Sequence, residues 1–402
     1  MRAGVGYSEQ PDTAEAGRLA VEKAMRQAGR SGPCDLVLLF ATAQHDARIL
    51  RDAVACAVGS SVPIIGGGTV GAICNDHFGY AGNQIILACL WLDGVRCDLL
   101  AEGDLRQGEA EVGRRLGKRL LDAGVTPDSP LLLFYDSIND GDGGIRMHMA
   151  TYLLAGMEDA MGFLPRTAAG AGMMGDYACS PVYQWTGVDM VRHNAMALLF
   201  SDDVRVDTTI MHGCRPGSGY HTVTRAEGQM ILEINGQPAL RFMNEAIGSN
   251  IPPENFPFFL TLGRNTGDKW GEFDEEAYVN RLCLAVEAER EALVMFEPDM
   301  VEGTEFQIMY RSLDLDYMAP SLDACFSRLE GRKPVFAMYI NCAGRAAGYN
   351  GSDLEDAAEI QKIVADRVPL LGIYTGVEIA PVRGRPRGLD WTGVFCLFSV
   401  PE

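Results

Sequence analysis

A glycine-rich turn recurs three times along this chain, and the recurrence constrains the fold more than any other feature of the sequence. The three copies are Val62–Ile73 (VPIIGGGTVGAI), Leu164–Asp176 (LPRTAAGAGMMGD) and Val368–Ile379 (VPLLGIYTGVEI). Each copy has a proline near its start, runs through glycines, and precedes a further hydrophobic strand pattern. Repetition over so long a period is too wide for a solenoid, so it predicts duplicated α/β units.

The same order of elements surrounds each copy of the turn. An apolar run of strand length comes first, and the three runs are DLVLLFATAQHD, PLLLFYDSINDGD and KPVFAMYINCAGR. A segment with helical spacing follows, and the three segments are Ala47–Val58, His148–Met161 and Leu354–Ala365. Continuous apolar runs are typical of strands buried on both faces. The predicted fold class is therefore α/β, with repeated strand–helix–strand units that form mixed sheets in two domains.

Two further stretches have the pattern of a strand, a tight turn and a second strand. They are NQIILACLWLDGVRCDLLAEGD, with a D-G turn, and NAMALLFSDDVRVDTTI, with a D-D turn. A D-G dipeptide between alternating apolar runs is a strong hairpin signal. Each stretch is therefore predicted to be a hairpin.

The chain divides into three parts by composition. Residues 1–34 are predicted to be a polar arm followed by a helix over Glu15–Gly29, and residues 35–215 hold the first two units. We place the main boundary between Gly213 and Gly228, and assign residues 228–400 to a second domain. Its first half contains the expected strands FPFFLTL, ALVMFEP and TEFQIMYRS, with helices starting near Pro238 and over Asp316–Glu330.

Charge and composition exclude several classes of protein. The net charge of −20 argues against binding to nucleic acid or to an anionic membrane surface. No signal-peptide pattern and no apolar run of membrane-spanning length is present, so a cytoplasmic location is expected. The eleven cysteines include no C-x-x-C pair and lie mostly in apolar contexts, which indicates reduced, buried thiols.

The first glycine turn contains a dinucleotide-like motif. Gly66, Gly68 and Gly71 spell G-x-G-x-x-G, but the residues that follow leave no room for the helix that such a site needs. The second copy repeats the spacing, which favours a backbone requirement over two cofactor sites. The turns are still expected to line a ligand cleft at the strand ends, with Gly66, Gly68 and Thr69 as ligand-binding candidates.

The third unit contains the charged residues that we consider as candidates for ligand binding. Cys342 and Arg345 directly follow an apolar strand, and Tyr374 and Glu378 lie in the third glycine turn. An arginine suits a carboxylate and a glutamate suits an ammonium, so the pair fits a zwitterion such as an amino acid. Two alternatives stay open: Arg345 and Glu378 pair with each other, or Cys342 is the nucleophile of an enzyme.

Other catalytic and metal-binding patterns are missing from the sequence. No G-x-S-x-G, H-E-x-x-H or P-loop is present, so no enzyme activity and no metal site are predicted. Asp136, Asn139, Asp140 and Asp142 resemble half of a calcium loop, but the closing glutamate is missing and a polar helix cap is preferred.

Several of these segments together resemble the FIST sensory domain. DLVLLFATAQHD, VPIIGGGTVGAI and NQIILACLW are similar to its N-terminal half. NGQPALRFMNEAIG, NCAGRAAG, VPLLGIYTGVEIAP and WTGVF are similar to its C-terminal half. The resemblance covers roughly residues 35–385, and its most specific parts are C-x-G-R at 342–345 and the run at 372–381.

The resemblance implies an intracellular ligand-sensing module of bacterial signal transduction that recognises an amino acid or a similar small molecule without any cofactor. Family members often accompany histidine kinases or cyclic-dinucleotide enzymes, so the output of this chain is expected to pass through such a separate partner. One branch of the family is reported to bind haem and sense nitric oxide. This alternative makes His212 and His221 candidate axial ligands.

Overall fold

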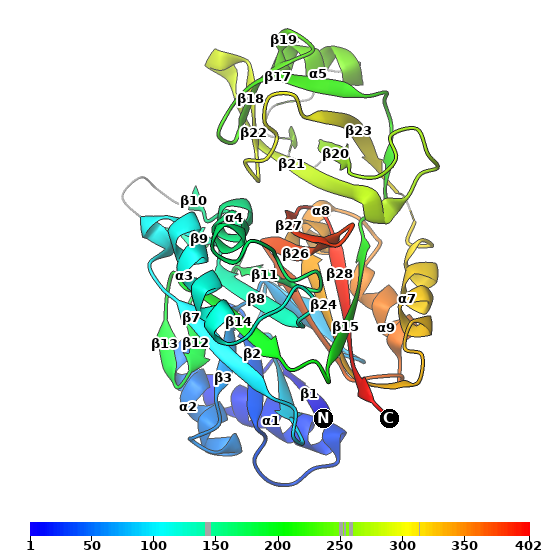
Figure 1. Cartoon of the computed structure of the whole chain (residues 1–402). Helices are drawn as coiled ribbons and strands as arrows, with labels where there is room; N and C mark the ends of the chain where they lie inside the picture. The colour runs from blue at the N-terminus through cyan, green and yellow to red at the C-terminus, as the bar shows by residue number, and fades with distance from the viewer. Residues whose placement is uncertain (141–145, 249–251, 253–254, 257–259, 313) are drawn as a thin grey trace.

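The computed structural model describes residues 1–140, 146–248, 252, 255–256, 260–312 and 314–402. Three α/β units form the lower body in Figure 1, and a β domain lies above it. The first unit covers residues 2–91, the second covers 97–200, and the third combines 205–211 with 318–401. The β domain, residues 214–311, is inserted within the third unit.

Each unit builds its own sheet, and each sheet ends in a hairpin that another unit supplies. The first sheet has the order β1 (Arg2–Ser8), β6 (Ile85–Trp91), β2 (Leu36–Ala41), β3 (Ile64–Gly68), β12 (Gln184–Gly187), β13 (Asp189–Val191). The second has the order β7 (Cys97–Glu102), β14 (Ala195–Phe200), β8 (Leu131–Asp136), β11 (Ala169–Met173), β26 (Val377–Val382), β27 (Arg385–Leu389). The third has the order β15 (Arg205–Met211), β28 (Gly393–Pro401), β24 (Arg332–Cys342), β25 (Leu370–Thr375), β4 (Gly71–Ile73), β5 (Phe78–Tyr80).

The exchange of hairpins is therefore cyclic. The first unit gives β4–β5 to the third sheet, the second gives β12–β13 to the first, and the third gives β26–β27 to the second. The two central strands of each unit, β2 and β3, β8 and β11, or β24 and β25, run parallel, and the other pairs are antiparallel. The predicted fold class and the threefold repeat are both confirmed.

The apolar strands are buried on both faces, as predicted from their continuous hydrophobic runs. In β2, Leu38 and Phe40 face a core shared by all three sheets, while Val37 and Leu39 face helices of the first unit. Phe40 meets Phe134 of β8 in this central core, with ring centroids 5.4 Å apart. The three sheets therefore enclose one common hydrophobic core.

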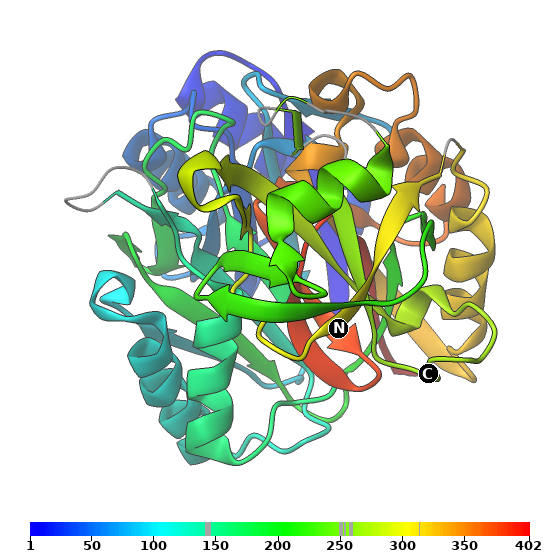
Figure 2. The ribbon, with the colours of Figure 1, turned by 90° about the horizontal axis from the view of Figure 1, so that it is seen from above.

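The helices cover the outside of the body (Figures 1 and 2). Their bounds are α1 (Thr13–Ala28), α2 (Ala47–Val58), α3 (Glu109–Asp122), α4 (Ala150–Met161), α7 (Met318–Ser327) and α9 (Asp356–Val364). The side chains of Asp12 and Asp46 cap α1 and α2 by accepting hydrogen bonds from backbone N–H groups of the first turn. Among the described residues, no helix has both the length and the apolar content that a membrane span requires.

The glycine turns owe their composition to close approach between parallel strands. A Cβ atom on Gly66 would lie 1.9 Å from the carbonyl oxygen of Leu39, and one on Gly170 would lie 1.7 Å from that of Leu133. Gly66 also has a φ of +137°, which side chains rarely tolerate. These glycines therefore satisfy a backbone requirement at equivalent points of two units.

Three sequence expectations are corrected. The two predicted hairpins do not form: β6 and β7 lie in different sheets, as do β14 and β15, because each strand pairs with its own unit. The expected polar arm begins with β1, which pairs with β6 and is mostly buried. Helix α3 was not expected, although Val112, Leu116 and Leu120 form its buried stripe at helical spacing.

The β domain is built largely from antiparallel strands. Its sheet contains β16 (Cys214–Pro216), β23 (Glu305–Arg311), β17 (His221–Glu227), β18 (Met230–Ile234), β22 (Ala292–Met295), β21 (Tyr278–Glu287), β20 (Thr261–Asn265) and β19 (Gln237–Pro238). Helix α5 (Ala239–Ile247) packs against β18 and β22. Figure 2 shows this domain lying over the body. Part of the predicted strand FPFFLTL, residues 257–259, lies outside the described residues, as does Asp142 of the calcium-like loop.

Candidate functional site

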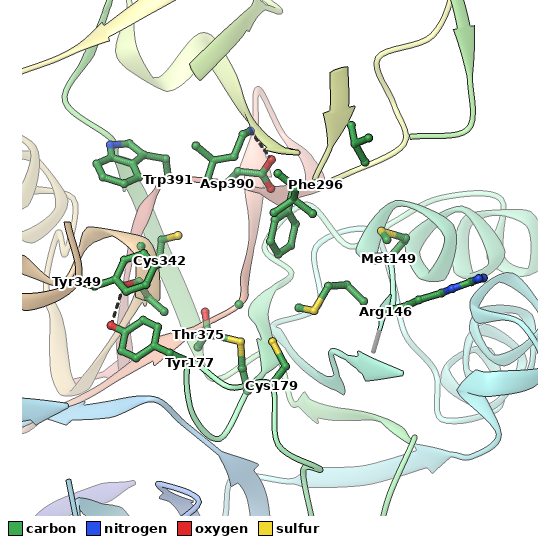
Figure 3. Close-up of a pocket in the computed structure, with 18 of the residues that line it drawn as sticks. Arg146, Met149, Tyr177, Cys179, Phe296, Cys342, Tyr349, Thr375, Asp390 and Trp391 are labelled. Atoms are coloured by element: carbon green, nitrogen blue, oxygen red, sulfur yellow. Dashed lines mark hydrogen bonds between the residues drawn. The ribbon is translucent and has the colours of Figure 1, made fainter. Parts of the chain in front are cut away.

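A pocket of about 390 Å³ lies where the parallel strands β24 and β25 end, between the second unit, the third unit and the β domain (Figure 3). Cys342 and Thr375 are register partners at these strand ends, and both line the pocket. Ligand sites in α/β folds commonly lie at the carboxyl ends of parallel strands. The volume is that of a site for a small molecule.

The pocket walls are mainly apolar, aromatic and sulfur-containing. The second unit and its β9–β10 hairpin, Ile138–Asn139 with Arg146–Met147, contribute Arg146, Met147, Met149, Met174, Tyr177 and Cys179. The third unit contributes Cys342, Ala343, Gly344, Tyr349, Thr375, Gly376, Asp390 and Trp391. The β domain contributes Gln229, Leu282, Leu284, Val294 and Phe296. The second unit, the third unit and the β domain are therefore all needed to complete the pocket.

Asp390 is the acidic group in this wall. Its side chain is 1% exposed, Oδ2 accepts a hydrogen bond from the Leu282 backbone N–H at 2.9 Å, and Oδ1 has no hydrogen-bond donor. The nearest guanidinium, that of Arg281, lies 4.0 Å from Oδ1 and is instead paired with Asp299, where Nη2 donates to Oδ2 at 2.8 Å. Burial raises the pKa of Asp390 to about 7, although Arg281 opposes the shift.

A second carboxyl group, Glu378 of β26, is buried in the same region. It accepts hydrogen bonds from Thr375 Oγ1 at 3.2 Å and from the Thr392 backbone N–H at 3.4 Å. Burial and then the nearby Asp390 raise the pKa of Glu378 well above its usual range. In the described part of the chain, neither Asp390 nor Glu378 has a hydrogen-bonded guanidinium, because Arg281 donates to Asp299 and Arg345 donates to Asp356. A ligand that brings positive charge or hydrogen-bond donors is therefore favoured.

Aromatic rings form another part of the wall. Tyr177 of the second unit stacks on Tyr349 of the third, with ring centroids 4.5 Å apart and planes within 3°. Tyr177 also donates a hydrogen bond to the Ala343 carbonyl at 3.0 Å. Trp391 has a φ of +52°, an unusual conformation for a bulky residue. Strained backbone is frequent at binding sites.

Cys342 and Glu378 are the sequence-predicted candidates that lie at or next to this pocket. Cys342 lines it, and Glu378 is hydrogen-bonded to the lining residue Thr375. Burial, followed by the charge of Glu378, raises the pKa of the Cys342 thiol. A thiol whose pKa is raised is a weak nucleophile at neutral pH, so this shift does not support the alternative in which Cys342 is a catalytic nucleophile.

Arg345 and Tyr374 lie behind the pocket and make structural contacts. Arg345 is 5% exposed, and its guanidinium donates to Asp356 at 2.7 Å, to the Tyr317 hydroxyl at 2.7 Å and to the His212 carbonyl at 2.9 Å. Tyr374 donates to Glu355 at 2.6 Å. The alternative in which Arg345 pairs with Glu378 is wrong, because Arg345 forms its ion pair with Asp356.

The glycine-turn candidates of the first unit lie elsewhere. Thr69 Oγ1 donates to the Tyr374 carbonyl at 3.0 Å and so joins the first unit to β25. Gly66 lies inside the first sheet, paired with Leu39. Gly68 lines a separate cavity of about 230 Å³. The structure therefore does not bring these three residues into the pocket at Cys342.

The two histidines considered for haem occupy different surroundings. His212 is 1% exposed, its Nδ1 accepts from the Cys214 backbone N–H at 2.9 Å, and its Nε2 lies 3.1 Å from the Glu275 carbonyl. Both ring nitrogens are engaged, so His212 does not fit an axial ligand. His221 lines a cavity of about 680 Å³ in the β domain, and burial lowers its pKa.

Several lining residues were missed from the sequence. Asp390 and Trp391 were not predicted as site residues, although Trp391 begins the segment WTGVF that resembles the C-terminal half of the FIST domain. Tyr177 and Phe296 could not be predicted from the sequence, because they come to lie beside the third unit only when the parts of the molecule assemble.

The exchanged α/β frame and the pocket closed by an inserted β domain define a ligand-binding protein. Two family matches make this more specific: the FIST N domain matches residues 35–237, and the FIST C domain matches residues 239–381. The chain therefore belongs to the FIST family, whose domains are sensory, non-catalytic and bind small ligands in signal transduction.

The curated relatives are themselves uncharacterized. The chain is 26% identical to the uncharacterized protein Mb0898c of Mycobacterium bovis over 47% of its own length and 49% of the relative. It is 25% identical to the uncharacterized protein Rv0628c of Mycobacterium tuberculosis, over 48% of its own length and 50% of the relative. The chain thus spans about half the length of the curated relatives it matches. A solved structure, cyanuric acid hydrolase from A. caulinodans, aligns at 12% identity with a TM-score of 0.25 over 49% of this chain and 71% of that one, which supports no inference.

Proposed function

We propose that this protein is a sensor whose ligand is an amino acid or a similar small amine that binds in the pocket at Cys342 and Asp390. The observation that carries the proposal is Asp390: it is buried, it lines the pocket, and its Oδ1 has no hydrogen-bond donor. A protonated amine placed there would supply both the missing donor and a positive charge. It would also favour the ionised form of a carboxyl group whose pKa is about 7.

The rest of the pocket is suited to the body of such a ligand. Trp391, Phe296 and Met149 provide aromatic and apolar surface, which favours a hydrophobic side chain. Figure 3 shows Arg146 and Met149 across the pocket from Trp391 and Tyr349. Arg146 is exposed and is the group that we assign to a ligand carboxylate, in place of the buried Arg345.

A thermal-shift screen of amino acids and small amines tests this proposal. A ligand at about one hundred times its Kd should stabilise the native state by about 2.7 kcal/mol, because it binds only the folded form. Asp390→Asn should weaken binding by roughly 10- to 100-fold, as expected for the loss of one hydrogen bond to a charged group.

Glu297→Gln is the matched control, because Glu297 belongs to the same acidic region but does not line the pocket. Removing its charge should weaken binding of the amine much less than Asp390→Asn does, since Glu297 does not line the pocket. A screen without any hit, or hits that bind Asp390→Asn as tightly as the wild type, would contradict the proposal.

The output is proposed to pass to a separate histidine kinase or cyclic-dinucleotide enzyme. This proposal rests on the family resemblance. Ligand-dependent activity of such an enzyme in the presence of the purified chain is the measurement that checks it. Equal enzyme activity with and without ligand would contradict it.

A haem-based sensor is the second candidate function, and the cavity beside His221 is the observation that favours it. This cavity has the larger volume, about 680 Å³, and Leu260, Ile308 and Met309 contribute apolar walls. Haem added to the purified protein should then give a Soret band that is lost in His221→Ala and kept in His212→Ala. Failure to form the band would remove this candidate.

A further inference from the structure

The turn between β4 and β5 brings together three side chains of metal-binding type. Cys74 Sγ lies 3.3 Å from Asp76 Oδ1, and His77 Nδ1 lies 3.0 Å from the same oxygen. The three donor atoms all lie within 4.8 Å of one another. In the described ranges, no other group of three histidine, cysteine or acidic side chains meets this criterion.

Contacts from both sides hold this turn in place. The Cys74 backbone N–H donates to the His77 carbonyl at 2.8 Å, and Gln361 of α9 donates to the Cys74 carbonyl at 2.8 Å. Asn75 donates to the Ala365 carbonyl at 2.8 Å and accepts from the Leu370 backbone N–H at 2.9 Å. The donor atoms are therefore displayed by a fixed turn, which lowers the cost of arranging them around an ion.

The side chains are placed so that an ion can enter from solvent. Cys74 is 6% exposed, whereas the side chains of Asp76 and His77 are 77% and 59% exposed. The His77 ring stacks on Tyr7 with a centroid distance of 5.7 Å, which fixes its orientation. The sulfur of Cys74 is therefore the buried donor of the group, and the Asp76 oxygen and the His77 nitrogen belong to its exposed side chains.

We propose that Cys74, Asp76 and His77 bind a Zn²⁺-type ion, with a fourth position left to water. Thiolate, imidazole and carboxylate are the ligands that zinc takes in proteins, and a site with three protein ligands and one open position is common. Tetrahedral zinc places neighbouring ligand atoms roughly 3.3–3.8 Å apart, close to the separations in the turn.

Binding of the ion by these three side chains balances in charge and in protons. The Cys74 thiol, whose pKa burial raises to about 12, releases its proton to solvent when sulfur bonds to the metal. The thiolate and the Asp76 carboxylate then neutralise the two positive charges of the ion, and His77 binds as the neutral imidazole. The hydrogen bond between Cys74 and Asp76 is replaced by two bonds to the metal.

Cobalt spectroscopy on the full chain tests the site. The reduced, chelator-treated protein is titrated with Co²⁺, which should give a thiolate-to-cobalt absorption band at one equivalent that Zn²⁺ then abolishes. Cys74→Ser should remove the band. His77→Ala should weaken Co²⁺ binding by at least about tenfold, since loss even of a supporting residue costs that much.

Cys56→Ser is the matched control, because Cys56 is an exposed thiol of α2 that lies outside the turn, and it should leave the band unchanged. If Cys74→Ser fails to fold, the Co²⁺ affinity of His77→Ala tests the site instead. This variant should fold, because the His77 side chain is largely exposed. A wild-type protein without the band, or a band of undiminished affinity in His77→Ala, would overturn the proposal.

Discussion

Asp390 holds a carboxyl group in a buried wall without a hydrogen-bonded cation. The Arg281 guanidinium that lies closest is directed at Asp299. The pKa of Asp299 falls to about 2 because Arg281 and Arg264, which both pair with it, together with the nearby Arg387 outweigh the effect of burial. Asp390 is left with one backbone donor, on Oδ2, and a buried Oδ1 that no donor among the described residues satisfies. One residue thus combines the energetic cost of a buried carboxyl group with a hydrogen-bond acceptor that lacks a donor.

The pH dependence of stability should reveal this cost. The pKa of Asp390 is about 7 in the folded protein and about 3.9 in an unfolded chain, so the folded state binds the extra proton between these values. Stability should therefore fall as pH rises from about 4 to 7, by an amount on the order of 4 kcal/mol for this group. In urea unfolding, Asp390→Asn should gain stability relative to the wild type between pH 5 and pH 8.

Buried acids that do not interact with Asp390 do not obscure this comparison, whereas the pKa of Glu378 falls in the variant because Asp390 helps to raise it. Burial raises the pKa of Asp136 to about 6, but Asp136 is present in both proteins and largely cancels in the difference. Wild type and variant curves that stay parallel across this pH range would show that Asp390 does not carry the proton.

At the scale of elements, the end of β24 is fixed by one guanidinium. Arg345, in the short 3₁₀ turn Ala343–Arg345, joins α9 through Asp356 and reaches Tyr317 next to α7. It also donates to the Trp391 carbonyl at 3.2 Å, in the segment that connects β27 to β28. The residue therefore positions the pocket wall without lining it.

Arg345→Ala should destabilise the protein by about 3–5 kcal/mol, because the variant leaves the Asp356 carboxylate buried without its partner. Urea denaturation followed by circular dichroism measures the change. Arg26→Ala is the control, since its pair with Glu22 is exposed and should contribute less than about 1 kcal/mol. Equal small effects in both variants would show that Arg345 is not a structural anchor.

The sequence predicted the elements that repeat and missed those that depend on assembly. Helices α2 and α4 were expected within two residues of their bounds, because apolar spacing and local helix formers agree there. The hairpin signal at Asp93–Gly94 was wrong, because β7 finds its partner in β14 rather than in its neighbour along the chain. In the candidate site, Cys342 was expected from its strand end. Asp390 was not, because its importance comes from Arg281 being committed to Asp299.

At the scale of the molecule, the cyclic exchange of hairpins makes the three units depend on one another. Without the third unit, β11 would lose β26 and the β4–β5 hairpin would lose β25. Unpaired strand edges expose backbone hydrogen-bonding groups and favour aggregation. The units are therefore parts of one cooperative structure.

A fragment of residues 1–211 should fail to fold alone, although it contains two complete units by sequence. We expect it to lack a cooperative urea transition, whereas co-expression with residues 212–402 should restore a soluble complex. Circular dichroism of the fragment and co-purification of the two pieces are the measurements. A cooperative transition in the isolated fragment would show that the first two units are self-sufficient.

The parallel strands of the three units end at equivalent positions, yet the surroundings of the three strand ends differ. The first end, at Ala41 and Gly68, lines a small cavity; the second, at Asp136 and Met173, is buried beside His193; the third, at Cys342 and Thr375, opens into the pocket. The frame has an approximate threefold symmetry, and the β domain breaks it by covering one end. Ligand choice can therefore diverge through the inserted domain while the symmetric frame stays unchanged.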